Sequence, residues 1–393
     1  MLILSLQLLA ALLQVAVIFV WIWQHVIMNR ARRDGMFVED DPANSAQESL
    51  TVIVPARNEA TRITDTLQHL LSQDYPDFRI VVVDDRSDDD TAGMVRAAAG
   101  GDPRVSVQRI ETLPKGWMGK SHAMWCAAQQ ATTHWLMFVD ADCHVLPRGL
   151  VNAVHYAGTG TLDMLSIWPR DGSVGFWERL LLPLCGAMIV IWYGRSARDK
   201  DHVAFANGQF LLVRREVYFS VDGHRAVRDA LIEDIPLARR FRAAGFRIAS
   251  AIGPDICCVR MYASLRELFR GWQRIYIGVL TPLQIALCMA SIVVGSLTPF
   301  ITIPICLSRV LHGGGLVWQV FCGLGVLHLA MLMTTSVRFF SIARCRIRYL
   351  WLYPLSCIGV LLILGAALFK SLRKSNVEWR GTHYQVRRTR IEA

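Results

Sequence analysis

The sequence has 393 residues, of which 53% are hydrophobic and only 19% are charged. Soluble domains carry about a quarter charged residues, so this composition argues against a wholly soluble protein. The basic residues behind the net charge of +10 crowd beside apolar runs, and no nucleic-acid recognition motif is present, so we expect no nucleic-acid partner.

The first predicted element is a transmembrane helix at residues 1–29, where His25 is the only acidic or basic side chain. The run exceeds the ~20 residues that a membrane-spanning helix needs. A basic cluster at residues 30–33 (RARR) follows the run instead of preceding it, which favours an uncleaved anchor with its C-terminal side in the cytoplasm. Residues 30–48 are then mostly polar and acidic and are predicted to form a linker.

Residues 49–274 alternate short apolar runs with helix-like segments, which predicts an α/β domain with a mostly parallel sheet. Three of the apolar runs end in unusual polar sequences. Residues 50–54 lead into PARNE, residues 80–83 into a pair of aspartates, and residues 135–139 into Asp-Ala-Asp. One such aspartate is commonly a helix cap or a turn residue. Three strand ends of this kind favour a ligand site, because ligands bind at the carboxyl ends of parallel strands.

The last of these sequences contains Asp140 and Asp142, a DxD pair. Two carboxylates at this spacing can point the same way. They suit Mg²⁺ or Mn²⁺, which take oxygen ligands and often complete their shell with diphosphate and water. A metal ion held there would neutralise charge on a leaving nucleotide diphosphate.

A second acidic pair, Glu233 and Asp234, precedes an apolar periodicity that predicts a helix, with Pro236 near its first turn. Two interpretations stay open. The carboxylates complement the positive end of the helix, or Asp234 is the general base that removes a proton from an acceptor hydroxyl.

Two further stretches lie near the predicted membrane. In LFRGWQRIY, at residues 268–276, Trp272 is a candidate to stack on a sugar, while Gln273 and Arg274 are candidates to hold phosphate or acceptor. The alternative is an aromatic and basic juxtamembrane belt. Segment 174–194 contains an uncharged stretch that is too short to span comfortably. We expect it to lie at the membrane interface, with a buried core helix as the alternative.

Residues 275–370 are predicted to be a C-terminal transmembrane region with about three apolar segments, and residues 371–393 form a basic tail. If each segment crossed once, the loop that carries Arg338 and Arg344 would be cytoplasmic and the basic tail outside. That arrangement opposes the positive-inside rule. One apolar run is therefore expected to stop short of a full crossing, and the sequence leaves open which one.

Together these motifs resemble glycosyltransferase family 2, which has the GT-A fold. The resemblance covers about residues 48–280. The matching stretches are TVIVPARNEA, IVVVDDRSDDDT, LPKGWMGKSHAM, FVDADC, ANGQFLLVRRE, IEDIPLARRFRAAGF and the terminal VEWRGTHY. A narrower resemblance to the hopene-associated, carotenoid-acid and ceramide glycosyltransferase groups rests on LPKGWMGK, FWERLLLPL and WRGTHY.

The resemblance implies a role for each matching residue. It makes Asp85 a ligand of the nucleotide base and places Pro55, Arg57 and Glu59 in the first nucleotide-binding loop. It makes Lys120 the basic residue that steadies the donor, assigns Asp140 and Asp142 to metal and diphosphate, and makes Asp234 the catalytic base. Apart from the resemblance, Glu233 is a candidate to contact acceptor or phosphate.

Processive relatives carry QxxRW near the membrane, whereas this chain has GWQRIY, with no Trp after Arg274. This difference favours transfer of a single sugar. The predicted function is inverting transfer of one sugar from a nucleotide-diphosphate donor to a lipid-type acceptor (hopanoid, carotenoid, ceramide or similar). The predicted enzyme is a multi-pass protein of a bacterial-type inner membrane with a cytoplasmic catalytic domain, and it uses Mg²⁺ or Mn²⁺.

Three alternatives remain. A sugar nucleotidyltransferase would need a glycine-rich loop, and PARNEA lacks the glycines. A processive polysaccharide synthase would need the missing tryptophan. A non-catalytic membrane scaffold or transporter would be favoured by charges within the spans, and the C-terminal spans carry none beyond His312 and His328.

Overall fold

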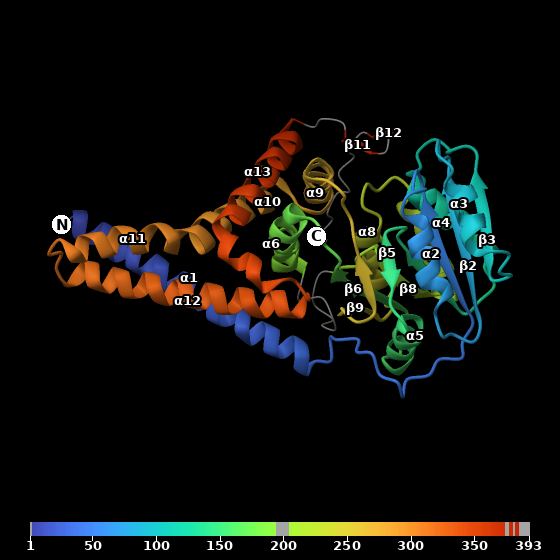
Figure 1. The fold of residues 1–393 in the computed structure, drawn as a ribbon, viewed down its shortest axis with the longest axis horizontal. Helices are drawn as coiled ribbons and strands as arrows, with labels where there is room; N and C mark the ends of the chain where they lie inside the picture. Colours follow the sequence, from blue (N-terminus) through green and yellow to red (C-terminus); the bar gives the residue numbers. More distant parts are fainter. Residues whose placement is uncertain (1, 194–203, 374–376, 380–381, 385–393) are drawn as a thin grey trace. The chain divides into compact units, whose positions relative to one another are not determined.

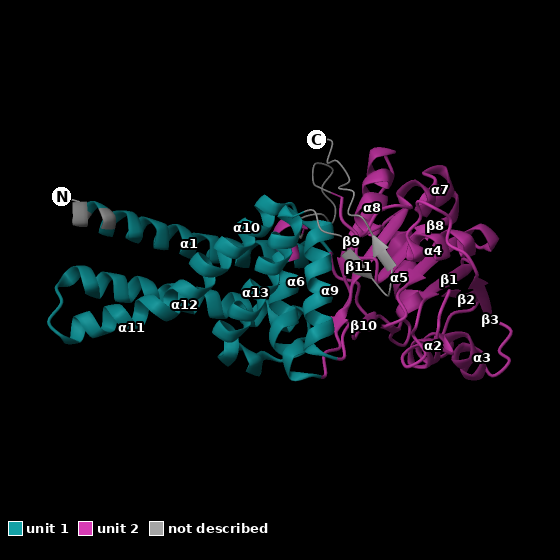
Figure 2. Cartoon of the chain, turned by 90° about the horizontal axis from the view of Figure 1, so that it is seen from above, with its two compact units in different colours: residues 1–35, 175–188, 264–373 teal, residues 36–174, 189–263, 374–393 magenta. Residues whose placement is uncertain are grey.

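The computed structural model describes residues 2–193, 204–373, 377–379 and 382–384. The chain divides into two compact units, shown in teal and magenta in Figure 2. The first, which we call the helical unit, contains residues 1–35, 175–188 and 264–373. The remaining residues form the second unit, which we call the sheet unit.

The sheet unit is built on a seven-stranded sheet (Figure 1). Its strands, in spatial order, are β3 (Val105–Ile110), β2 (Phe78–Asp85), β1 (Leu50–Ala56), β4 (Trp135–Val139), β8 (Phe210–Arg214), β6 (Met164–Trp168) and β9 (Ile248–Ile252). Neighbouring strands are parallel except for β8, which is antiparallel to β4 and β6. The predicted α/β class with a mostly parallel sheet is confirmed.

Helices cover both faces of this sheet because its strands are apolar on both sides. Along β1, Val52 and Val54 face one core, which also contains Leu67 of α2, whereas Ile53 faces a second core with Met124 of α4. The helices of the sheet unit are α2 (Ile63–Leu71), α3 (Thr91–Ala99), α4 (Gly119–Gln130), α5 (Gly149–Thr159), α7 (Arg215–Ser220), η1 (Gly223–Val227) and α8 (Asp234–Ala243).

Two smaller sheets complete the strands that the structure describes. One contains β5 (Cys143–Val145), β10 (Cys257–Val259) and β7 (Arg170–Asp171). The other is a hairpin of β11 (Val377–Trp379) and β12 (Thr382–Tyr384), which contains part of the VEWRGTHY motif. Most of the predicted basic tail, residues 371–393, lies outside the described residues.

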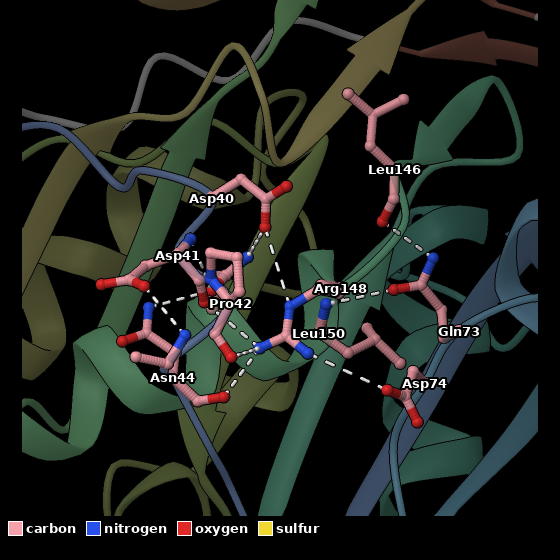
Figure 3. A network of polar contacts seen from close by, with 11 residues as sticks. Asp40, Asp41, Pro42, Asn44, Gln73, Asp74, Leu146, Arg148 and Leu150 are labelled. Atoms are coloured by element: carbon pink, nitrogen blue, oxygen red, sulfur yellow. Dashed lines mark hydrogen bonds and ion pairs between the residues drawn. The ribbon is translucent and has the colours of Figure 1, made fainter.

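Residues 36–48, part of the predicted linker, pack along the sheet unit as a strap. The Val38 N–H donates to the Ile252 carbonyl at 2.9 Å, and the Val38 side chain is buried. Figure 3 shows how Arg148 holds the following turn. Its Nη2 donates to the carbonyl oxygens of Asp41, Pro42 and Asn44 at 3.2, 3.3 and 2.7 Å. The strap is therefore an ordered part of this unit.

The helical unit contains α1 (Leu2–Arg33), most of α6 (Phe176–Tyr193), α9 (Leu265–Val279), α10 (Pro282–Ala290), the π-helix η2 (Ser291–Leu297), α11 (Thr298–Leu311), α12 (Leu316–Ile342), η3 (Ile347–Leu352) and α13 (Tyr353–Leu372). Within the described residues, five stretches are long and apolar enough to cross a membrane: Gln7–Arg33, Phe176–Tyr193, Pro282–Leu311, Leu316–Ile342 and Ile347–Leu372. This composition indicates a membrane protein.

Candidate active site

The Asp-Ala-Asp sequence forms a tight turn directly after β4. The Cys143 N–H donates to the Asp140 carbonyl at 3.0 Å, and the Asp140 N–H donates to the carbonyl of Gln209 at 3.2 Å. The Thr66 hydroxyl of α2 donates to the Ala141 carbonyl at 2.6 Å. The backbone of the turn is thus held from two sides. Asp142 lies half-buried in the same turn.

Lys120, the second residue of α4, joins this turn to the downstream acidic pair. Its Nζ lies 2.8 Å from Oδ1 of Asp140 and 2.7 Å from Oε1 of Glu233. The three side chains are 18%, 27% and 10% exposed, so solvent screens these ion pairs only partly. Burial opposes the charged lysine, but the two carboxylates outweigh burial and raise the pKa of Lys120. Burial also opposes ionisation of Glu233, yet the charge of Lys120 lowers its pKa.

Asp234 is the first residue of α8, next to Glu233. Its Oδ2 accepts a 2.7 Å hydrogen bond from the Gly208 N–H, and its Oδ1 accepts one from the Ile235 N–H at 2.7 Å. Burial, followed by the neighbouring charge of Glu233, raises the pKa of Asp234 to about 7, against the opposing charge of Lys120. Asp234 is therefore a carboxylate poised to exchange a proton near neutral pH.

Asp85, at the end of β2, lies against the start of α4. A Cβ atom added at Gly119 would overlap the Asp85 carboxylate, so the glycine permits this close approach. Arg86 forms a fork on the same carboxylate, with Nε at 2.8 Å from Oδ1 and Nη2 at 3.1 Å from Oδ2. Since Gly119 precedes Lys120, the end of β2 and the end of β4 meet at the N-terminus of α4.

The loop after β1 and the loop after β2 are bound to each other. The Asn58 N–H donates to the Ser87 hydroxyl at 3.0 Å, and the Glu59 N–H donates to the Thr91 hydroxyl at 2.9 Å. Asp84 stabilises the second loop by accepting from the Ser87 N–H at 3.1 Å. Of the three residues expected in the first nucleotide-binding loop, Pro55 lies in strand β1, and Arg57 and Glu59 lie in the loop that follows it.

His224 lies behind the acidic pair and is almost fully buried. Its Nδ1 is 2.9 Å from the Tyr218 hydroxyl. Burial lowers the pKa of His224 to about 4, although Glu233 acts in the opposite direction. The imidazole is therefore neutral at physiological pH, which leaves Lys120 as the cation that pairs with Glu233.

The structure brings together five of the residues expected at the site: Asp85, Lys120, Asp140, Glu233 and Asp234. Sequence reasoning gave no role to Gly119, Gly208, Arg86 or His224. Gly208 had a signal, because ANGQ directly precedes the apolar run that forms β8. A Cβ atom at this position would lie 3.1 Å from Oδ2 of Asp234.

Trp272, Gln273 and Arg274 lie on α9, in the helical unit. Trp272 and Gln273 are buried, and Oε1 of Gln273 accepts a 2.7 Å hydrogen bond from Nζ of Lys370. The Trp272 ring packs on Tyr276, with centroids 5.4 Å apart. Their part in binding acceptor or phosphate stays a prediction.

The chemistry available at the site is that of carboxylate oxygens and of the cationic side chains of Lys120 and Arg86. No group of three or more His, Cys, Asp or Glu side chains in the described part of the chain is arranged to hold a metal ion by itself. A cation at the Asp-Ala-Asp turn would need further oxygen ligands from a bound molecule, as Mg²⁺ commonly takes from substrate phosphates.

Residues 51–219 match the family model described as glycosyl transferase family 2. The chain carries a family 2 glycosyltransferase domain. It is also 28% identical over 239 residues to 4,4'-diaponeurosporenoate glycosyltransferase from Staphylococcus aureus strain MRSA252, over 59% of this chain and 61% of the relative. The same enzyme of strain USA300 gives the same identity and coverage. The chain thus matches about three fifths of the length of these curated relatives.

Among solved structures, the chain is similar to a mannosyltransferase from Pyrobaculum calidifontis in complex with GDP-Man and Mn²⁺. The TM-score is 0.52 at 19% identity, over 92% of this chain and 99% of the mannosyltransferase. At this identity the likeness concerns the fold alone. The GT-A fold expected for the family 2 domain is confirmed.

Proposed function

We propose that this protein is an inverting glycosyltransferase that moves one sugar from a nucleotide-diphosphate donor to a lipid-type acceptor at the membrane. The family 2 domain supports the reaction class, and the carotenoid-type relative together with the apolar helices supports an apolar acceptor. The observation that carries the proposal is the link from Asp140 through Lys120 to Glu233, with Asp234 directly beside it.

In the proposed reaction, Asp234 is the general base. The acceptor oxygen attacks the anomeric carbon from the face opposite the diphosphate. The new carbon–oxygen bond forms as the bond to the diphosphate oxygen breaks, and the acceptor proton passes to a carboxylate oxygen of Asp234. The hydrogen bond from Gly208 orients the carboxylate, and a pKa of about 7 keeps it basic enough to accept the proton near neutral pH.

The donor is proposed to lie along the carboxyl edge of β1, β2 and β4. Asp85 would accept from the base, beside the loop that contains Pro55, Arg57 and Glu59. Lys120 would exchange one of its carboxylate partners for a diphosphate oxygen. Because Lys120 lies between Asp140 and Glu233, it can stabilise the departing diphosphate without a large movement.

A divalent cation fits the Asp-Ala-Asp turn by the chemistry of its donors. Asp140 and Asp142 offer hard carboxylate oxygens, and the side chain of Asp140 is 27% exposed. The Mn²⁺ in the similar mannosyltransferase supports the same proposal. A bound Mg²⁺ or Mn²⁺ would neutralise the negative charge on the diphosphate.

The acceptor side of the proposal involves Glu233, Trp272, Gln273 and Arg274. A lipid acceptor would reach the enzyme through the membrane in which the helical unit lies. The basic residues in the last turn of α1 and in the loop after α12 support a cytoplasmic position for the family 2 domain, by the positive-inside rule.

The test is an assay of the detergent-purified protein with a panel of nucleotide-sugars, membrane lipid extract and MgCl₂ or MnCl₂. We expect release of a nucleoside diphosphate and a lipid product that mass spectrometry shows to be heavier by one sugar. Asp234→Asn is the control and should give neither product. Release of pyrophosphate would instead indicate a nucleotidyltransferase, and a ladder of sugars would indicate a processive synthase.

A further inference from the structure

Five stretches are apolar and long enough to cross the membrane, but the strand pairing in the seven-stranded sheet excludes a crossing by one of them. Helix α6 joins the part of the chain that contains β4 to the part that contains β8. These two strands pair along their whole length, from Trp135 opposite Arg214 to Val139 opposite Phe210. A crossing by α6 would place paired strands on opposite sides of the membrane. Helix α6 therefore enters and leaves on the same side.

Three other segments meet at one depth within the helical unit. The carbonyl oxygen of Gly295, in η2, accepts hydrogen bonds from Nε1 of Trp21 in α1 at 3.0 Å and from Nε2 of His328 in α12 at 2.9 Å. Gly295 lies near the middle of Pro282–Leu311, and His328 lies near the middle of α12. This contact marks the midplane of three crossing segments, which are α1, α10–η2–α11 and α12.

Helix α13 begins at this same depth. The hydroxyl of Tyr353, its first residue, lies 3.1 Å from the hydroxyl of Ser296, and its ring stacks on Phe300 with centroids 6.5 Å apart. From there the helix runs antiparallel to α10 and α9. A Cβ atom at Gly365 would lie 3.8 Å from the Met289 methyl group, and Lys370 donates to Gln273. From the start of α13 to its end, the residues that it contacts therefore come progressively earlier in the sequence, from Ser296 through Met289 to Gln273.

The rise per residue of an α-helix gives the depth of each of these contacts in the membrane. At 1.5 Å per residue, Pro282 lies about 20 Å from Gly295, already beyond the ~15 Å that separates the midplane from the edge of the hydrocarbon core. Gln273 precedes Pro282 in the chain, and Lys370 contacts Gln273. The helix from Tyr353 to Lys370 is about 25 Å long, so it passes from the midplane out of the membrane on the side of α9.

We propose that α13 inserts into one leaflet only, so that the helical unit crosses the membrane three times and the end of α13 lies on the same side as the family 2 domain. The occupant of its exposed apolar face is then one leaflet of the lipid bilayer. That face contains Leu355, Ile358, Leu362, Phe369 and Leu372, whereas Cys357, Val360, Ile363 and Leu364 are buried within the unit.

The distribution of charge supports this topology independently. With three crossings, the basic residues in the last turn of α1, those in the loop after α12 and those at the end of α13 all lie on one side. They include Arg30, Arg32, Arg33, Arg344, Arg346, Arg348, Lys370 and Arg373. The opposite connection, between α11 and α12, carries only Arg309 and His312 nearby. A fourth crossing would separate the last cluster from the others, against the positive-inside rule.

The first test places the same epitope tag at three positions in separate full-length proteins: between Gly313 and Gly314, between Arg344 and Cys345, and after Ala393. Antibody binding is measured in intact and permeabilised spheroplasts. We expect the tag after Ala393 to behave as the tag at Arg344 does, and opposite to the tag at Gly313. A terminal tag that behaves as the Gly313 tag does would overturn the proposal, whatever the enzyme's activity.

The second test compares two matched substitutions, Leu362→Arg and Val326→Arg, at exposed positions of α13 and α12. Leu362 is the middle residue of α13, so a full crossing would bury the new arginine at the midplane. With a single-leaflet insertion it lies near the headgroups, about 13 Å from Tyr353 along the helix. Val326 lies two residues from His328 and so at the midplane in either case.

An arginine at the midplane is costly, whereas one near the headgroups is tolerated. We therefore expect Leu362→Arg to reach the membrane fraction at close to the wild-type amount and Val326→Arg to be reduced several-fold. Equal losses in both variants would contradict the proposal. This readout is the amount of inserted protein, so it does not depend on the proposed sugar transfer.

Discussion

The backbone N–H of Gly208 donates a 2.7 Å hydrogen bond to Oδ2 of Asp234. The next residue, Gln209, accepts from the N–H of Asp140 through its carbonyl oxygen. One short loop before β8 therefore holds both the proposed base and the proposed metal-binding turn. Because this loop makes both bonds with its own backbone groups, it holds the Asp234 carboxylate relative to the backbone of the Asp140 turn more firmly than flexible side chains would.

Gly208→Ala should lower kcat and leave the fold intact. The added Cβ would lie 3.1 Å from Oδ2 of Asp234 and 3.3 Å from Oε1 of Glu233, so the carboxylates must shift by a few tenths of an ångström. A small misplacement of a catalytic group costs on the order of 10- to 100-fold in rate. Steady-state kinetics with the thermal unfolding curve checks this.

The control for this substitution is Gly158→Ala in α5, where a Cβ atom would meet nothing within 4 Å. It should leave kcat unchanged and stabilise the helix slightly, since alanine is the better helix former. Wild-type kcat in Gly208→Ala would show that the loop does not position the base.

Asp234→Asn should lower kcat by about 10³-fold, because an amide cannot accept the acceptor proton. In the wild type, the pKa of about 7 makes the carboxyl group increasingly protonated, and inactive as a base, as the pH falls below 7. The rate should therefore rise with pH through about 7 and then level off. The pH profile of kcat at saturating substrates measures this, and a rate that falls as the pH rises from 6 to 8 would contradict the assignment.

Asp142→Ala should abolish transfer and weaken Mn²⁺ binding while the protein stays folded. The turn is held through backbone atoms, by the Thr66 hydroxyl on the Ala141 carbonyl and by the Arg260 N–H on the Asp142 carbonyl, so loss of this side chain should not unfold it. Mn²⁺ binding in the presence of a nucleoside diphosphate can be followed by electron paramagnetic resonance. Unchanged Mn²⁺ affinity together with full activity would exclude Asp142 as a ligand.

Several parts of the site could be predicted because short sequences determine them. The strand ends that place Asp85 and Asp140 at one sheet edge follow from buried apolar runs and from the rule that parallel strands present ligands at their carboxyl ends. The acidic pair at the start of α8 follows from helix periodicity. The long-range partners do not follow from either pattern. No local signal shows that Lys120 bridges the carboxylates of Asp140 and Glu233, which lie far apart in the sequence.

Other parts could not be read from composition. Residues 36–48 are polar enough for a linker, yet Arg148 binds three of their carbonyl oxygens, a contact between segments about a hundred residues apart. Likewise the apolar run of α13 is long enough to cross a membrane. Only its partners, Ser296 at one end and Gln273 at the other, distinguish it from α12.

Lys120→Met should destabilise the family 2 domain as well as inactivate it. The substitution leaves Asp140 and Glu233 without their shared cation, and breaking a largely buried pair by removing one partner costs about 3–5 kcal/mol. The pKa of Glu233 should rise, because Lys120 is the largest of the influences that lower it. Thermal unfolding in detergent measures the loss of stability. Lys115→Met, at an exposed position in the preceding loop, is the control and should be neutral.

Arg148→Ala should release the strap without touching the proposed chemistry. The guanidinium group is the shared donor to the carbonyl oxygens of Asp41, Pro42 and Asn44, and its loss leaves these acceptors to water (Figure 3). The expected cost is about 1–3 kcal/mol, from several hydrogen bonds made by a charged donor. Limited proteolysis should then cut within residues 36–48 faster than in the wild type.

The matched control is Arg79→Ala, at an exposed position on β2. It removes the same charge from the same unit, so it separates loss of the strap contacts from loss of a positive charge. Val38 should keep part of the strap in place in both variants, because its side chain is buried and its N–H is bonded to Ile252. Cleavage should therefore concentrate around Asp41–Asn44. Equal cleavage rates in Arg148→Ala and Arg79→Ala would show that the strap is held by its other contacts, such as the packing of Val38 and the hydrogen bonds of Asn152, and not by the arginine.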